Sequence, residues 1–260
     1  LGWNVTGGTI VPDAANALGS AAVAIDGATL AVTNAAVGTL ANNVSVGAGG
    51  LTIAAPVDLT LSGAITGASG TRVVKTGTGN LTLSGQFGTQ SSAPMELDLT
   101  EGTTTLSGGQ KNVTVTLAGA IVHLHAGAIT GSGTITNTSA SSKFISRLNA
   151  GAATVTNPIV LNETLTIESP NGTNRLTMAG AISGTGGLSL IGNGPKSLDG
   201  TNTYTGATTI TAGNVRVNGS ITNNSTVTVG SGAQLGGNGT INSTTTLQAG
   251  STLSLVDGVG

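Results

Sequence analysis

Short segments in which aliphatic residues alternate with threonine or another polar residue recur along the whole chain. Clear examples are Leu51–Ile53, Leu59–Leu61, Leu81–Leu83, Val113–Leu117, Leu165–Ile167, Val215–Val217 and Val227–Val229. A period of two places the aliphatic side chains on one face of a strand and the polar, mostly β-branched ones on the other. Glycine, asparagine and serine, which tolerate tight turns, fill the intervals. The pattern therefore predicts many short strands, each with one buried face.

No window carries a helical apolar period over more than two turns. The alanine-rich stretch Val11–Ala24 comes nearest, but it contains Pro12 and Gly19, and both residues disfavour a helix interior. The chain is therefore expected to be all-β.

Strands of three to five residues favour a parallel β-solenoid, in which each strand pairs with strands of the turns above and below. A three-sided turn would take roughly 20 to 25 residues, so 260 residues make roughly 10 to 13 turns. The alternative is an antiparallel sandwich, whose strands are longer and whose core holds more aromatic residues. Trp3, Phe87, Phe144 and Tyr204 are all the aromatic residues present. We therefore predict a single β-solenoid domain over residues 1–260.

The amino-acid composition excludes several classes of function. With no cysteine there is no disulfide or thiolate chemistry. Eight Lys and Arg residues against ten Asp and Glu residues leave a net charge of −2, so no nucleic-acid partner is expected. No apolar run is long enough to insert into a membrane. The low charged fraction of 7%, with ordered aliphatic residues throughout, indicates a secreted type of protein.

The phrase Gly-Ala-Ile recurs at residues 63, 127 and 180, and a more specific pattern follows Gly187. The sequence Asn-Thr-Tyr-Thr-Gly at 202–206, then Thr-Thr-Ile at 208–210 and Ala-Gly-Asn-Val-Arg-Val at 212–217, resembles the autotransporter-associated β-strand repeat, also called the passenger-associated transport repeat. The best match covers residues 187–241; the copy at 61–85 lacks the Asn-Thr-Tyr-Thr-Gly element. The resemblance implies a right-handed parallel β-helix (β-solenoid) that is extracellular or exposed on the cell surface.

Two clusters could carry metal or acid–base chemistry. His123 and His125 would share one face of a strand, beside inward Val122 and Leu124, but two ligands do not make a metal site. Glu96, Asp98 and Glu101 could hold calcium or act as acid and base. Leu97 and Leu99 are expected to occupy the buried face of this strand, which favours a solvated face for the acidic residues.

Other motifs are interpreted as structural. The glycine-rich segment 236–241 lacks the aspartate of calcium-binding turns, and the segment 192–197 lacks the Gly-Lys pair of a phosphate loop. The basic residues are scattered, and the pair Lys143 and Arg147 is expected to have no nearby acid. Tyr204 is expected to pack over a turn with its hydroxyl on a backbone group, and sugar stacking is the alternative. We therefore predict no catalytic, cofactor-binding or metal-binding residues, no cofactor and no enzymatic activity.

The ends of a solenoid expose unpaired backbone groups above an open core. No polar cap is evident at either end, and we identify possible self-assembly residues there: Leu1, Trp3, Val5, Leu253, Leu255 and Val256. Either the chain continues beyond these residues, or one end stacks on the other. Such stacking would be a heterologous contact that does not close, and therefore a filament. The leading hypothesis is an extracellular structural protein that forms or extends surface fibres, with itself as partner end to end. The alternative is an adhesin-like passenger or stalk that binds host or matrix glycans, with extracellular polysaccharide as a second candidate partner.

Overall fold

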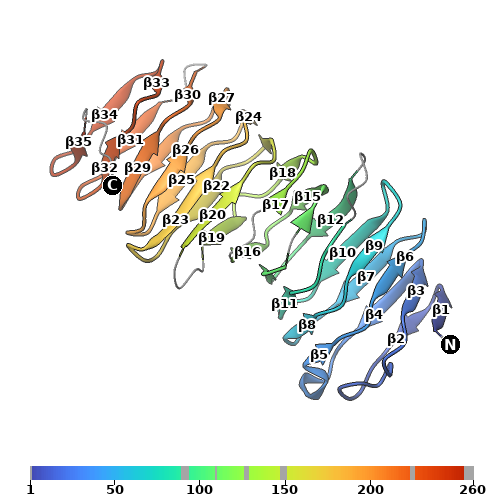
Figure 1. The fold of residues 1–260 in the computed structure, drawn as a ribbon. Helices are drawn as coiled ribbons and strands as arrows, with labels where there is room; N and C mark the ends of the chain where they lie inside the picture. Colours follow the sequence, from blue (N-terminus) through green and yellow to red (C-terminus); the bar gives the residue numbers. More distant parts are fainter. Residues whose placement is uncertain are drawn as a thin grey trace. The chain divides into compact units, whose positions relative to one another are not determined.

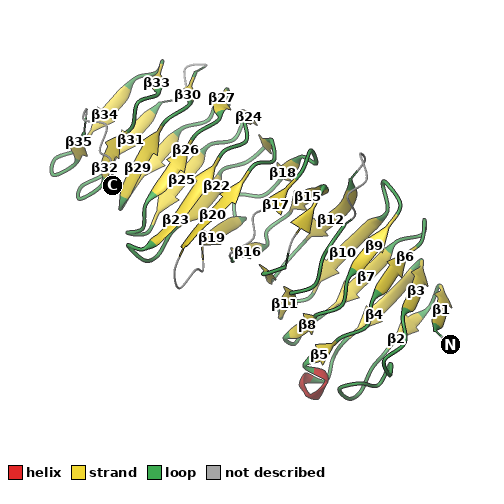
Figure 2. Ribbon diagram, in the orientation of Figure 1, coloured by secondary structure: helices red, strands yellow, loops and turns green. Residues whose placement is uncertain are grey.

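The computed structural model describes residues 2–88, 94–108, 110–125, 129–146, 151–222 and 226–254. It is nearly all β, and its parallel sheets stack as a β-solenoid of about 11 turns (Figure 1). Among the described residues the one helix is the short 3-10 turn η1 (Ala35–Val37) (Figure 2). The predicted all-β parallel solenoid is confirmed, and the antiparallel sandwich is excluded. Residues 12–22, within the weak helix candidate, form turns rather than a helix.

The structure divides into two compact units, and the first comprises Leu1–His123 and Ile129–Gly133. Its chain passes repeatedly through three parallel sheets. The first contains β1 (Trp3–Thr6), β3 (Val23–Asp26), β6 (Val44–Val46) and β9 (Ile65–Gly67), and β14 (Gln110–Lys111) pairs with β17 (Ile129–Thr130). The second contains β2 (Thr9–Ile10), β4 (Ala28–Ala31), β7 (Leu51–Ala54), β10 (Arg72–Thr76), β12 (Met95–Leu99) and β15 (Val113–Leu117). The third contains β5 (Thr39–Leu40), β8 (Leu59–Leu61), β11 (Asn80–Leu83) and β13 (Thr103–Leu106), while β16 (Ile121–Leu124) spans the unit boundary.

The second unit comprises Leu124–Ala128 and Thr134–Gly260 and has the same three-sided course. One side contains β20 (Gly151–Val155), β23 (Asn174–Met178), β26 (Lys196–Leu198), β29 (Asn214–Val217), β32 (Gln234–Gly236) and β35 (Thr252–Leu253). Another contains β19 (Lys143–Ser146), β22 (Leu165–Glu168), β25 (Leu188–Ile191), β28 (Thr208–Ile210), β31 (Val227–Val229) and β34 (Thr245–Leu247). The remaining side contains β18 (Ile135–Asn137), β21 (Ile159–Leu161) and β24 (Ile182–Gly184), followed by β27 (Thr201–Asn202), β30 (Ser220–Ile221) and β33 (Thr240–Ile241). The backbone bond from Thr203 N to Ile182 O, 2.7 Å, joins the two sets on that side.

Register partners on adjacent turns lie between 18 residues apart, as for Met95 and Val113, and 24 residues apart, as for Arg72 and Glu96. The shortest turns are thus slightly shorter than the sequence predicts. All seven alternating segments are strands, and their aliphatic residues are buried. In β15, for example, Val113, Val115 and Leu117 point inward while the threonines between them remain half-exposed. Each fully buried aliphatic side chain contributes roughly 1.5–3 kcal/mol, so these stacked columns form the core.

The turns between strands approach each other too closely for most side chains. A Cβ atom on Gly63, for instance, would lie 2.0 Å from the backbone oxygen of Asn42 on the preceding turn. Buried asparagines satisfy other turn carbonyls. The side-chain nitrogen of Asn42 donates to the oxygens of Gly19 and Ala21, at 3.0 and 2.7 Å. This packing explains why glycine and asparagine recur at the corners.

Candidate functional site

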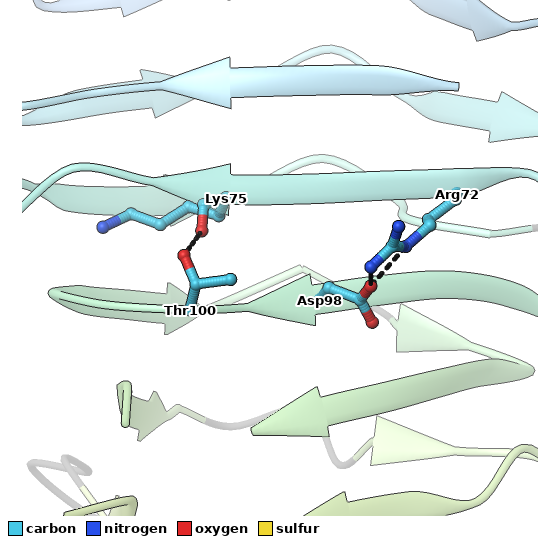
Figure 3. A network of polar contacts seen from close by, with 4 residues as sticks. All are labelled: Arg72, Lys75, Asp98 and Thr100. Atoms are coloured by element: carbon cyan, nitrogen blue, oxygen red, sulfur yellow. Dashed lines mark hydrogen bonds and ion pairs between the residues drawn. The ribbon is translucent and has the colours of Figure 1, made fainter. Parts of the chain in front are cut away.

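The acidic cluster of the sequence does not act as one site. Asp98, on β12, forms an ion pair with Arg72 on the neighbouring strand β10 (Figure 3), and only 11% of the Asp98 side chain is exposed. Leu97 and Leu99 are buried as predicted. The expectation of a solvated acidic face is nevertheless wrong for Asp98, because the register of β10 and β12 brings a guanidinium group to it.

The third acid of that cluster has a different partner. The Glu101 carboxylate accepts a hydrogen bond from the backbone nitrogen of Gly77, 2.6 Å from its Oε1. Glu101 therefore binds the loop at Gly77, on the preceding turn of the solenoid, instead of joining Asp98 in a calcium or acid–base site. Among the residues that the structure describes, no three His, Asp or Glu side chains gather as metal ligands.

The most unusual residue beside this cluster is Lys75, which lies inside the core. It occupies an inward position between Ile53 and Leu99 on the adjacent turns and has no exposed surface. Its Nζ donates to three backbone carbonyls, those of Gly77, Gly79 (2.8 Å) and Glu101 (2.9 Å). Burial lowers the pKa of Lys75, and the charge of Glu101 partly opposes that effect. Because an ammonium group has three donors, all of them are occupied.

A second lysine is buried in the other unit. Lys196, on β26, lies between Leu176 and Val215 and is 2% exposed. Its Nζ donates to the carbonyls of Gly192 and Gly194, at 2.7 and 2.8 Å. Burial lowers the pKa of Lys196 to about 8, against the opposing attraction of Glu168.

In the sequence both lysines are isolated basic residues, and we did not predict that they are buried. A signal was available, since Lys75 stands two residues after inward Val73 and Lys196 two residues before inward Leu198. A period of two places such residues on the same face.

Another cation also has a partner that the sequence does not reveal. Lys143, on β19, lies 3.1 Å from the carboxylate of Glu168 on β22. The expectation that no acid accompanies Lys143 is therefore wrong, because the acid comes from the adjacent turn. Arg147 lies outside the described residues.

The histidine pair agrees with its structural interpretation. Val122 and Leu124 are buried, while His123 and His125 are half-exposed. The two imidazoles therefore do not fill the core, as the alternation predicts.

Tyr204 is completely buried, so its ring is not available to stack on a sugar. Its hydroxyl lies 2.6 Å from Oγ1 of Thr208, an inward-facing residue of β28. The partner of the hydroxyl at this bond is thus a side-chain hydroxyl.

The two glycine-rich motifs are corners of the solenoid. Gly237 has φ +110°, and a Cβ there would lie 2.2 Å from the oxygen of Val217. The segment 192–197 encloses the ammonium of Lys196, as described above. Both motifs therefore shape turns.

Of the predicted assembly residues, the structure describes Trp3, Val5 and Leu253; Leu1, Leu255 and Val256 lie outside the described residues. Trp3 is the register partner of buried Val23, so it occupies a core column, yet it is 52% exposed. Its Nε1 donates to the oxygen of Leu18 at 2.9 Å, which holds the indole across the first turn.

The opposite edge has the same character. Leu253 is 44% exposed although its register partner Leu235 is 1% exposed. Leu247 and its buried partner Val229 show the same contrast. A hollow of about 240 Å³ opens beside these residues, lined by Val217, Leu235, Gly236, Gly237, Gly239, Ile241, Thr245, Leu253 and Ser254. The last described turn therefore presents an apolar surface.

No family model, curated protein or solved structure matches the chain. The autotransporter-repeat resemblance therefore stays an expectation from the residues themselves. Within the described part of the chain, no helix has the length and apolar character needed to cross a bilayer.

Proposed function

We propose that this protein is a structural β-solenoid, outside the cell or on its surface, that extends fibres by stacking one copy on the next. The observation that carries the proposal is the continuation of the core columns into both edge turns. Leu253 and Leu247 at one edge, and Trp3 at the other, occupy core register positions and yet remain 44%, 44% and 52% exposed.

The order of the sheets determines which edges would meet. At one edge the outermost described strands of the three sheets are β1, β2 and β5, and at the other they are β33, β34 and β35. Following the three-sided course, β35 of one copy would pair with β1 of the next, and β33 with β2. Ile241 would then continue into the column of Ile10, and Leu253 into that of Trp3 and Val5. Head-to-tail pairing keeps all strands parallel and leaves a new free edge, so the assembly continues.

The edge strands also lack the features that usually prevent such pairing. None of these six strands contains a charged residue or a proline, although charged side chains and prolines commonly block edges. A junction over the full cross-section would bury about 600–1,000 Å² per copy, which is the size of a stable interface.

Paired cysteines test both assembly and its geometry, because the chain has no cysteine of its own. Asn4→Cys with Thr252→Cys joins outward positions of β1 and β35, the strands expected to meet. Thr9→Cys with Thr252→Cys is the matched control, since Thr9 lies on β2. We expect mild oxidation to give a ladder of disulfide-linked oligomers only for the first pair. Equal ladders for the two pairs would contradict the proposed alignment.

Light scattering and negative-stain microscopy measure assembly itself. Leu247→Glu places a charge on the apolar edge and should abolish fibres, while Thr246→Glu on the same strand faces outward and should retain them. Far-UV circular dichroism checks that both variants remain β-rich. An unmodified chain that stays monomeric at millimolar concentration would overturn the proposal.

A second candidate function is the binding of extracellular glycans, favoured by one specific feature. The outward positions of five consecutive strands, β22 to β34, carry hydroxyl groups in register: Thr166, Ser189, Thr209, Thr228 and Thr246. Strands lie about 4.8 Å apart, so these hydroxyls form a regular column that could hydrogen-bond a polysaccharide. A glycan array tests this, with Thr209→Val and Thr228→Val expected to reduce any binding.

A further inference from the structure

The two buried lysines occupy the same kind of corner. Gly77-Thr78-Gly79 connects β10 to β11, and Gly192-Asn193-Gly194 connects β25 to β26. In each corner one lysine Nζ donates to the carbonyl oxygens of both glycines. The first glycine has positive φ in both cases, +86° at Gly77 and +79° at Gly192, a conformation that glycine adopts without strain.

The lysines reach these corners from opposite sides. Lys75 stands two residues before the first glycine, whereas Lys196 stands two residues after the second. On the other side of its corner, two residues from the nearer glycine, Lys75 has Leu81 as its counterpart. Lys196 has Leu190 in the same way, and both leucines are fully buried. Each corner is therefore flanked by one lysine and one leucine. The lysine precedes the glycines in the first corner and follows them in the second.

A carboxylate from an adjacent turn accompanies each ammonium group, again from opposite sides. Glu101, in the turn after Lys75, bonds to the corner through the nitrogen of Gly77. Glu168 lies on β22, the strand that precedes and pairs with β25, and its charge acts on Lys196. Each corner thus combines a lysine ammonium group, the carbonyls of two glycines and a carboxylate from an adjacent turn.

The preceding corner in the first unit supplies a comparison. Residues 55–57 there read Ala-Pro-Val, between Ile53 and Leu59, which are the register partners of Lys75 and Leu81. This corner has the same length but neither the glycine pair nor a lysine. Other Gly-x-Gly corners, at 131–133, 184–186 and 237–239, have φ between +106° and +120° at the first glycine and no lysine at the flanking positions. The buried ammonium therefore accompanies the Gly-x-Gly corners whose first glycine has φ near +80°.

We infer that a Gly-x-Gly corner with φ near +80° at its first glycine is a binding site for one primary ammonium group, which either flanking strand can supply. Its two glycine carbonyls converge on a point inside the core, where an unpaired carbonyl is costly. A lysine from either side places its Nζ at that point, since the two flanking positions are equivalent in distance from the glycines.

A double-mutant cycle on the second corner tests the inference. Lys196→Leu leaves both glycine carbonyls without their donor, and Leu190→Lys forces two ammonium groups into one corner. We expect each single variant to lower the melting temperature by about 5 °C or more. The double variant should recover most of that loss, because the lysine then enters from the other strand. A loss in the double variant equal to the sum of the single losses would overturn the inference.

Two further measurements keep the test decisive if a variant fails to fold. The reciprocal exchange, Lys75→Leu with Leu81→Lys, should behave in the same way in the other unit. Lys196→Ala should in addition be stabilised by n-propylammonium chloride, which replaces the missing side chain, and not by tetramethylammonium chloride at equal concentration. A ligand that binds the folded state raises the melting temperature. No difference between the two salts would contradict a site for a primary ammonium group.

Discussion

Lys75 and Glu101 are joined across two turns by a reciprocal pair of interactions. The Lys75 Nζ donates to the backbone oxygen of Glu101 at 2.9 Å, and the Glu101 carboxylate accepts from Gly77, two residues after Lys75. One residue thus satisfies both the buried ammonium and the corner that encloses it. This clasp adds to the sheet pairing, the apolar packing and the Arg72–Asp98 ion pair that hold the same two turns together.

Gly102→Ala should disrupt that clasp. A Cβ at Gly102 would lie 2.5 Å from the Lys75 Nζ and 2.6 Å from the oxygen of Gly77, and φ there is +67°. We expect the free energy of unfolding to fall by on the order of 3 kcal/mol. Gly70→Ala is the matched control, because φ is +72° but no atom lies within 4 Å; backbone strain alone should cost about 1 kcal/mol. Equal losses in urea denaturation would show that the Lys75 contact is unimportant.

The stability of the protein should rise between pH 8 and pH 10. Lys196 has a folded-state pKa of about 8 against an ordinary value of 10.5, so in this window the unfolded chain binds the additional proton. The free energy of unfolding therefore increases with pH, by on the order of 2 kcal/mol for this residue. Lys196→Met retains Lys75 and should show a correspondingly smaller rise. Parallel pH dependences of the two proteins in urea titrations would refute the assignment.

Asp98→Asn should destabilise the first unit more than Glu96→Gln on the same strand. Asp98 pairs with Arg72 and is largely buried, but the Arg72 side chain is 60% exposed, so solvent screens the pair. We expect a loss of about 1 kcal/mol for Asp98→Asn and little change for Glu96→Gln. Thermal unfolding at low and high salt measures both, and the Asp98 effect should shrink as salt rises.

Tyr204 and Thr208 should be energetically coupled. Tyr204→Phe leaves the buried Thr208 hydroxyl without this partner and should cost about 1–2 kcal/mol. Thr208→Val should have a similar cost for the converse reason. In the double variant both polar groups are gone, so its loss should be clearly smaller than the sum of the two. Additive losses in denaturant unfolding would indicate that the 2.6 Å contact contributes nothing.

Much of the fold could be predicted from local patterns. The alternation in Leu81–Leu83 determines which side chains point inward, and the short strands with glycine corners exclude long-stranded sandwiches. The candidate site residues were less accessible to such reasoning. Asp98 resembles a solvated acid in the sequence because its partner Arg72 lies 26 residues earlier, more than one full turn of the solenoid.

The sequence by itself determined the period of two, the strand lengths and the stacking of aliphatic columns, since these follow from the conformational preferences of neighbouring residues. Only the tertiary structure decided which turns lie against each other. That register places Lys75 beside Glu101, buries Lys196 and leaves Leu253 and Trp3 partly exposed. The physical reason is that turn lengths vary from 18 to 24 residues, so contacts between turns depend on the sum of many loops and cannot be obtained from any one segment.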